Sequence, residues 1–150
     1  MDGSVRWTVE FYEFLSPGSW PTEEQAAESE AVHRRARTNG ARHGTPIIVS
    51  SLGEADPRIN LFFRVGSMAS AQPSTWRRYA HALVVWLDFL AVFGQRWDEA
   101  SVGDVEAFKD WRLTDPRNPR MVAPTSFDTD RAALATFYGC RRSCNSPTKP

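Results

Sequence analysis

The chain has 150 residues, of which 41% are hydrophobic and 12% aromatic, so it is long enough and apolar enough to bury the core of one domain. This composition excludes a disordered chain, which would be poor in aromatic residues and rich in charge. The 18 Lys and Arg residues equal the 18 Asp and Glu residues, so no global basic field marks a nucleic-acid binder. A DNA-binding function would have to rest on a local group of cations.

The sequence offers no support for membrane insertion, export or a structural metal. No apolar run approaches the roughly 20 residues that span a bilayer, and no leader-like apolar run follows a basic start. Cys140 and Cys144 lack the neighbouring His or Cys that would complete a four-ligand zinc site. We therefore expect a soluble, cytoplasmic protein with no metal and no cofactor.

The N-terminal part predicts a strand followed by a polar helix. Residues 5–11 alternate between apolar and polar side chains, which is the period of a half-buried strand. Thr22 and Gln25 form a capping box, so a helix should begin there and stop at the TNG sequence of residues 38–40. The HRRAR cluster at residues 33–37 is interpreted as a solvated helix end that matches the helix dipole, with phosphate contact as the alternative.

The next segment carries weaker signals. PIIVSSLG at residues 46–53 is typical of a short extended run ending in a glycine turn. DPRINLFFRV at residues 56–65 predicts a short helix that docks on the later domain. GSMASAQPS at residues 66–74 is small and polar, and is interpreted as a linker or hinge.

From Pro73 onward, hydrophobic residues at helical spacing predict three helices. The first has Ser74 as its cap and runs to Gly94. Ser101 opens the second, which points Lys109 and Arg112 outward and stops at DPRNP, residues 115–119. The third begins at Thr125, with Asp128 three residues on.

The expected fold class is therefore mainly α. A compact helical bundle occupies residues 73–139, an α+β N-terminal arm with a strand, a helix and a linker occupies residues 1–72, and a disordered tail occupies residues 140–150.

The order and spacing of the helical motifs resemble the N-terminal core-binding domain of tyrosine recombinases, the phage-integrase family. The similarity covers about residues 46–139. Its motifs are T-x-x-x-Y-x-x-x-L-x-x-x-L-x-F-L from Thr75, G-x-x-W from Gly94, D-V-x-x-F-x-x-W-R from Asp104, and Ala133-Leu134 with Phe137-Tyr138. The resemblance implies a SAM-like helical domain that holds double-stranded DNA in DNA integration and site-specific recombination.

In that family, a separate C-terminal domain cuts and rejoins DNA through a tyrosine nucleophile. After Phe137-Tyr138 this chain reads GCRRSCNSPTKP, so we expect the catalytic half to be lacking. Tyr138 matches a structural position of the family and not its nucleophile. We therefore expect no catalytic residue and no enzyme activity from this chain.

DNA binding would come from Lys, Arg and helix N-termini that contact phosphates. Arg77 and Arg78 are expected in the first turn of their helix, where the dipole disfavours a cation, and this mismatch suggests an external anion. Residues 109–120 have a net charge of +2 and form the best local basic patch of the helical unit. The candidate DNA-binding residues are Thr75, Arg77, Arg78, Lys109, Arg112, Arg117, Arg120, Thr125 and Arg131.

Several of these residues have ordinary alternatives. Thr75 and Thr125, which head helices by the family match, can be plain caps. Arg131 can pair with Asp128 or Asp130 instead of DNA. Residues 71–139 hold 8 basic and 9 acidic residues, which also favours a second hypothesis: a non-catalytic fragment that pairs with a recombinase protomer or another protein.

Overall fold

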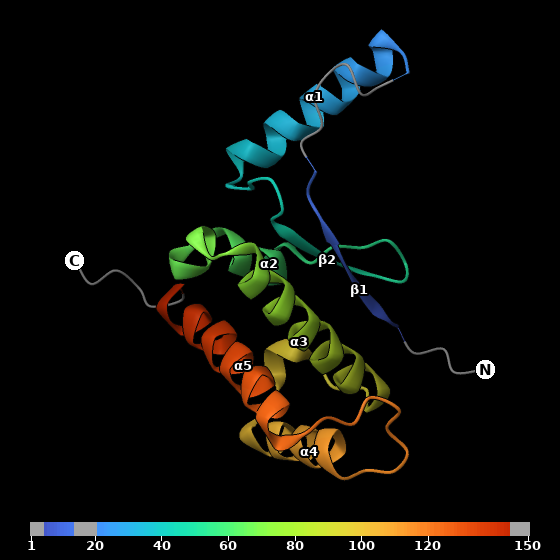
Figure 1. Cartoon of the computed structure of the whole chain (residues 1–150), viewed down its shortest axis with the longest axis vertical. Coiled ribbons are helices and arrows are strands. Elements are labelled where there is room, and N and C mark those ends of the chain that lie inside the picture. Colours follow the sequence, from blue (N-terminus) through green and yellow to red (C-terminus); the bar gives the residue numbers. More distant parts are fainter. Residues whose placement is uncertain (1–4, 14–20, 145–150) are drawn as a thin grey trace.

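The computed structural model describes residues 5–13 and 21–144, with side chains through residue 139 (Figure 1). In chain order, the elements are β1 (Trp7–Phe11), α1 (Glu23–Thr38), β2 (Pro46–Ser50), α2 (Pro57–Asn60), α3 (Pro73–Val92), α4 (Val102–Leu113) and α5 (Pro124–Cys144). Short 3-10 helices are η2 (Leu61–Arg64), η3 (Gly66–Ser70) and η4 (Trp97–Glu99). The described chain is mainly helical with one two-stranded antiparallel sheet, so the predicted class is confirmed.

The two strands form a small sheet that lies against α3. They pair antiparallel, with Trp7 opposite Ser50 and Phe11 opposite Pro46. Side chains of β1 alternate between half-buried and exposed, which confirms the half-buried strand. The backbone N–H of Trp7 donates a 2.8 Å hydrogen bond to the Asp88 carboxylate, which ties the strand to α3.

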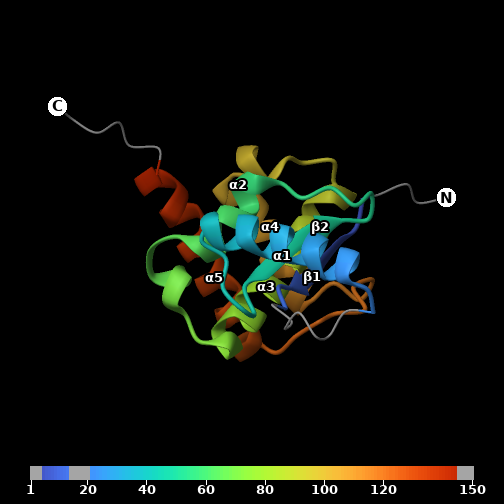
Figure 2. The same cartoon turned by 90° about the horizontal axis from the view of Figure 1, so that it is seen from above.

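Helix α1 extends away from the rest of the molecule (Figure 1), and in the view from above it crosses in front of the strands (Figure 2). It begins where the sequence predicted, because the Thr22 hydroxyl accepts the amide hydrogen of Gln25. It ends at Asn39, followed by Gly40 with φ of +89°, a conformation that other residues rarely adopt. Only Ala36 is buried, so almost the whole helix surface is solvated.

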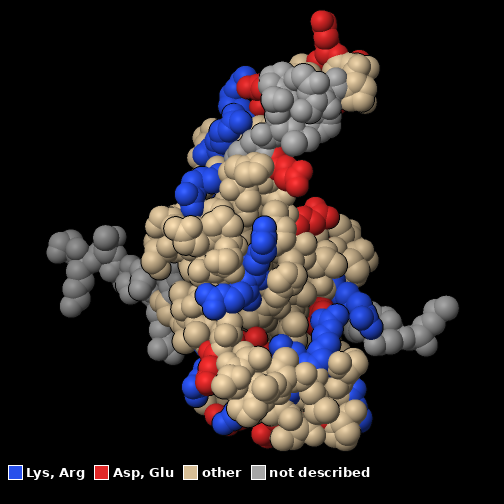
Figure 3. Space-filling view, in the orientation of Figure 1, with Lys and Arg blue, Asp and Glu red and all other residues tan. Residues whose placement is uncertain are grey.

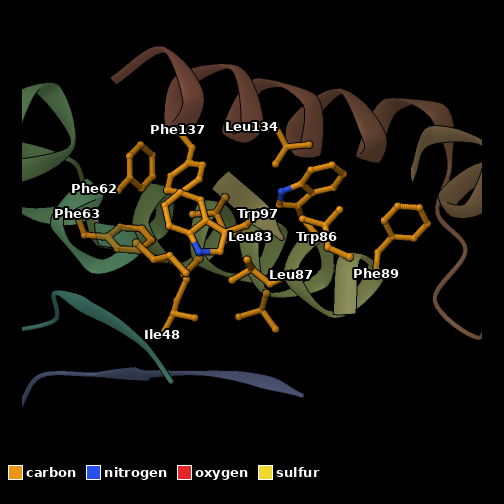
Figure 4. Packing of buried hydrophobic residues seen from close by; sticks show 14 of the residues in the cluster. Ile48, Phe62, Phe63, Leu83, Trp86, Leu87, Phe89, Trp97, Leu134 and Phe137 are labelled. Carbon is orange, nitrogen blue, oxygen red and sulfur yellow. The ribbon is translucent and has the colours of Figure 1, made fainter. Parts of the chain in front are cut away.

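Helix α3 is the centre of the core. It lies between α5 on one side and the strands on the other (Figure 4). Nine of its 20 residues are buried, and Trp86 is fully enclosed by rings from α3, α4 and α5. A helix that is covered on two sides needs apolar residues on more than one face, which explains why its hydrophobic pattern is so dense.

The core crosses the boundary that was expected at residue 72. Ile48 from β2, Ile59 from α2 and Phe62 and Phe63 from η2 belong to the same buried cluster as α3. The segment interpreted as a linker contains η3, whose Met68 carbonyl accepts the indole N–H of Trp76 at 2.7 Å. The linker interpretation is therefore wrong: the segment forms a short 3-10 helix anchored by buried Met68, although most of its residues are exposed. The core around α3 includes residues that precede this segment in the chain.

Of two expectations for the C-terminal half of the chain, one is confirmed and one changes. Ser101 and Asp104 cap α4 with a reciprocal capping box, which confirms where that helix begins. Helix α5 continues to Cys144, so the expected disordered tail is wrong for residues 140–144, while residues 145–150 lie outside the described residues. None of the helices within the described residues is long and apolar enough to cross a membrane.

Candidate nucleic-acid interface

Arg77 and Arg78 lie near the start of α3, in its second turn and not in the first turn where they were expected. The helix begins at Pro73 with Gln72 as N-cap, so the predicted cap at Ser74 is wrong and both arginines fall in the second turn. The dipole argument weakens there, because the effect fades beyond the first turn. The observation that still favours an external anion is that both side chains are exposed, and neither guanidinium makes an ion pair or hydrogen bond with any described residue. Exposed His81 follows one turn later.

A turn from the N-terminal half of the chain lies against this end of α3. The guanidinium of Arg42 sits over the Trp76 ring, 4.7 Å from its centroid. The turn depends on Gly44, whose φ is +86° and whose missing Cβ would lie 3.8 Å from the Trp76 ring. Arg42 is therefore held beside the residue that directly precedes Arg77.

Helix α1 ends next to this turn and adds further arginines. Arg34 and Arg35 are exposed in its last turns, together with Arg37. On the face shown in Figure 3, basic side chains run along α1, past its lower end and onto the body over α3, while acidic side chains border them on the right. We call the group formed by Arg34, Arg35, Arg37, Arg42, Arg77 and Arg78 the basic end.

A sequence signal for the basic end exists and was missed. Residues 31–53 and 57–87 contain eight arginines and not one Asp or Glu. Net charges taken over whole halves of the chain hide these two segments, because acidic residues concentrate elsewhere. The contact between Arg42 and Trp76, which joins the two segments, spans 34 positions of sequence, and no local pattern predicts it.

Arg112, predicted to point outward, is buried at 7% exposure. Its Nε donates to the Asp130 carboxylate at 2.9 Å, and its Nη1 donates to the Arg120 carbonyl. The prediction is wrong because Asp130, also buried, comes from α5 and needs a cation in the core. Arg112 fixes the loop before α5 and is not available to DNA.

Three other predicted arginines are exposed but engaged. Arg117 pairs with Asp115 at 2.8 Å, Arg120 with Asp88 at 3.6 Å, and Arg131 with Asp128 at 2.8 Å. Hydrogen bonds from Arg117 lower the pKa of Asp115 below its usual value, which reflects the favourable contact between the two side chains. The expected patch at residues 109–120 is therefore largely neutralised from within.

The remaining candidates are separated from one another. Lys109 is exposed on α4, and Thr125 is exposed as the second residue of α5. Thr75 is half-buried as the third residue of α3, and the hydroxyl does not cap that helix. Of the predicted residues, the structure brings together Thr75, Arg77 and Arg78, with Lys109 and Thr125 on other helices.

Tyr138 has a structural environment. Its hydroxyl accepts the indole N–H of Trp86 at 2.9 Å and donates to the Trp97 carbonyl at 2.7 Å. The hydroxyl therefore joins α3, η4 and α5 at the edge of the core. In the described residues, no three His, Cys, Asp or Glu side chains gather as metal ligands.

Comparison with known proteins returned no relative: no family model, no curated protein and no solved structure matches the chain.

Proposed function

We propose that this chain binds double-stranded DNA through the basic end. The observation that carries the proposal is the contrast among its arginines. Arg77 and Arg78 are exposed without a carboxylate partner in the described residues, whereas Arg112, Arg117, Arg120 and Arg131 are neutralised within the protein. Phosphate binding needs cations that are free to replace counterions, and Arg77 and Arg78 supply them within the basic end.

The proposal includes the resemblance to the core-binding, SAM-like domain of tyrosine recombinases. The helical course of the chain from Pro73 onward, the capping box of α4 and the structural position of Tyr138 support it. In that case the chain acts in DNA integration and recombination without catalysing strand exchange. The DNA surface proposed here keeps Arg77 and Arg78 from the one predicted from sequence. It adds the arginines of α1 and Arg42, and leaves out the paired arginines of residues 109–120.

Fluorescence anisotropy with a labelled duplex tests the proposal. With about five phosphate contacts, the slope of log K against log salt should be about −4 to −5, so affinity should fall roughly 500-fold between 50 and 200 mM salt. The variant Arg77→Gln/Arg78→Gln should bind much more weakly. The matched control is Arg117→Gln/Arg131→Gln, which removes the same charge from exposed but paired positions. Equal losses in both variants would refute a localised surface.

A second function, protein interaction without DNA binding, is favoured by one observation. The loop before α5 was expected to contact DNA, but arginines in and beside it form ion pairs within the protein. The same loop borders an apolar pocket. A flat anisotropy signal at tens of micromolar protein would favour this function.

A further inference from the structure

A pocket lies at the opposite end of α3 from the basic end. Its volume is about 230 Å³, and it is bordered by the start of β1, the C-terminal end of α3 and the loop before α5. Figure 1 shows these three segments meeting at the lower right of the molecule. Its lining includes Arg6, Asp88, Phe89, Phe93, Trp111 and Arg120.

The floor and one wall of the pocket are aromatic. Phe89 is buried, and its ring lies 4.8 Å from that of Phe93 and 5.5 Å from that of Trp111. Phe93 is nevertheless 65% exposed, and its neighbour Val92 is 63% exposed. Large apolar groups at a helix end normally find cover, so their exposure beside a cavity indicates a binding surface.

The opposite wall is preformed. Asn118 is 3% exposed, donates from its side chain to the Trp111 carbonyl at 3.0 Å, and accepts the amide hydrogen of Arg120 at 2.8 Å. The buried Arg112 holds the same loop through the Arg120 carbonyl. A ligand would therefore meet a wall that needs little ordering, which lowers the entropic cost of binding.

The rim carries a net positive charge. Arg6 and Arg120 face one carboxylate, Asp88, which already accepts the Trp7 amide hydrogen and pairs with Arg120. Arg6 attracts the Asp88 carboxylate only by a longer-range Coulomb interaction, and its guanidinium makes no ion pair with the described residues. The unmatched charge at the rim favours an anionic group beside an apolar one.

A second cavity, of about 300 Å³, lies near η4 and does not share this character. Its cations are satisfied: Arg58 pairs with Asp56 and Asp98, and Arg96 pairs with Asp98, all at about 3 Å. Among the described residues that line it, each cation has a carboxylate partner, so that cavity does not select an anionic ligand.

We infer that the pocket beside Phe93 receives a single aromatic side chain from a protein partner, with an acidic residue next to it in contact with Arg6. The volume is below the roughly 300 to 1,000 Å³ of a site for a drug-sized molecule but fits one aromatic ring. Buried aromatic side chains supply most of the energy in many protein interfaces. The inference is independent of DNA binding, because it uses the other end of α3.

Two-dimensional NMR of the full chain tests the inference with the peptide acetyl-Glu-Phe-Glu-amide. The peptide should shift the amides of residues 88–93, 111, 118 and 120, with a Kd of about a millimolar for so small a ligand. The peptides acetyl-Glu-Ala-Glu-amide and acetyl-Lys-Phe-Lys-amide should bind at least ten-fold more weakly. Equal binding of the alanine or lysine peptide would overturn the aromatic or the acidic part of the inference, respectively.

Variants and a small acid complete the test. Phe93→Ser should weaken the peptide at least ten-fold, whereas Val102→Ser, at a position 80% exposed on α4, should leave it unchanged. Arg6→Gln should weaken binding of the acidic peptide and provides a second variant if Phe93→Ser does not fold.

Phenylacetate tests whether the partner is a protein. If phenylacetate binds as tightly as the peptide, the pocket takes a small aromatic acid and the inference of a protein partner is overturned. Arg77→Gln/Arg78→Gln should retain peptide binding, so failure of the DNA proposal remains distinguishable.

Discussion

Helices α1 and α3 both carry arginine clusters, yet they serve the molecule in opposite ways. Of the 16 residues of α1 only Ala36 is buried, whereas nine of the 20 residues of α3 are buried. The charges of α1 follow its dipole, with Glu23 and Glu24 in the first turn and Arg35 and Arg37 in the last. Helix α3 has neither arrangement, so its exposed arginines are not explained by the helix that carries them.

This difference shows where stability and charge reside. Folding depends on α3 and its neighbours, because apolar burial is the dominant favourable term. Helix α1 buries little apolar surface, and its main contribution is a projecting row of cations beside those of α3. Substitutions that change the buried core and the exposed charges separately test this difference between α1 and α3.

The largest effect should come from the centre of α3. Trp86→Ala should lower the free energy of unfolding by about 3 to 5 kcal/mol, because it leaves a cavity among three helices and removes the partner of the Tyr138 hydroxyl. Urea denaturation measures it. Val32→Ala on α1, where Val32 is 61% exposed, is the control and should change stability by less than about 0.5 kcal/mol. Similar losses of stability for both variants would contradict the claim that α3, and not α1, carries the core.

A buried arginine should behave unlike those of the basic end. Arg112→Met should cost about 3 to 5 kcal/mol, because Asp130 would remain buried without its cation. The double variant Arg112→Met/Asp130→Leu should recover most of the loss, since it also removes the stranded charge. Arg77→Met should have almost no effect on the same urea transition. A large loss for Arg77→Met would mean that this arginine has a structural role.

Asp88, the one acidic residue of α3, should show a smaller effect that depends on pH. Asp88→Ala should cost about 1 to 2 kcal/mol by removing the acceptor of the Trp7 amide hydrogen. Asp88→Asn keeps an acceptor and removes the charge.

Burial raises the pKa of Asp88 in the folded protein above its usual value of 3.8. The folded state therefore binds the proton more tightly, and stability is lost as pH rises from 3.8 through the folded pKa. Asp88→Asn should thus be at least as stable as the natural chain at pH 7, and its advantage should vanish near pH 3. Thermal melts across this range check the direction, and an advantage that grows on acidification would contradict it.

The smallest effect should come from α1. Ala31→Gly, at an exposed position, should loosen the helix locally by about 1 kcal/mol while leaving the main unfolding transition within about 0.5 kcal/mol. Hydrogen exchange should show faster exchange in α1 alone. Loss of protection in α3 would show that the two helices unfold as one unit.

Sequence reasoning recovered elements whose signals are local. The alternation around Trp7, the cap at Thr22 and the cap at Ser101 each depend on neighbours within a few residues, and the structure contains all three. It failed where the partner is distant. Arg112 is turned inward by Asp130, 18 positions away. Met68 is held by a hydrogen bond from the Trp76 indole to its carbonyl, which the small polar residues around Met68 do not predict.

The candidate site shows the same limit. Arg77 and Arg78 were predicted as phosphate contacts from their place in the chain. That α1 and Arg42 share the same surface depends on how a turn with two left-handed glycines folds back onto α3. Whether an arginine is free or paired depends on carboxylates elsewhere in the fold. Charge counted along the chain therefore ranked residues 109–120 above the basic end.

The most direct test of the account is the salt dependence of DNA binding in a set of paired variants. If α1 and α3 form one surface, Arg34→Gln/Arg35→Gln and Arg77→Gln/Arg78→Gln should each reduce the slope of log K against log salt by about 1.8, and their combination by about twice that. The control Arg117→Gln/Arg131→Gln should leave the slope near that of the natural chain. A slope that responds to the control pair and not to the basic end would contradict the account.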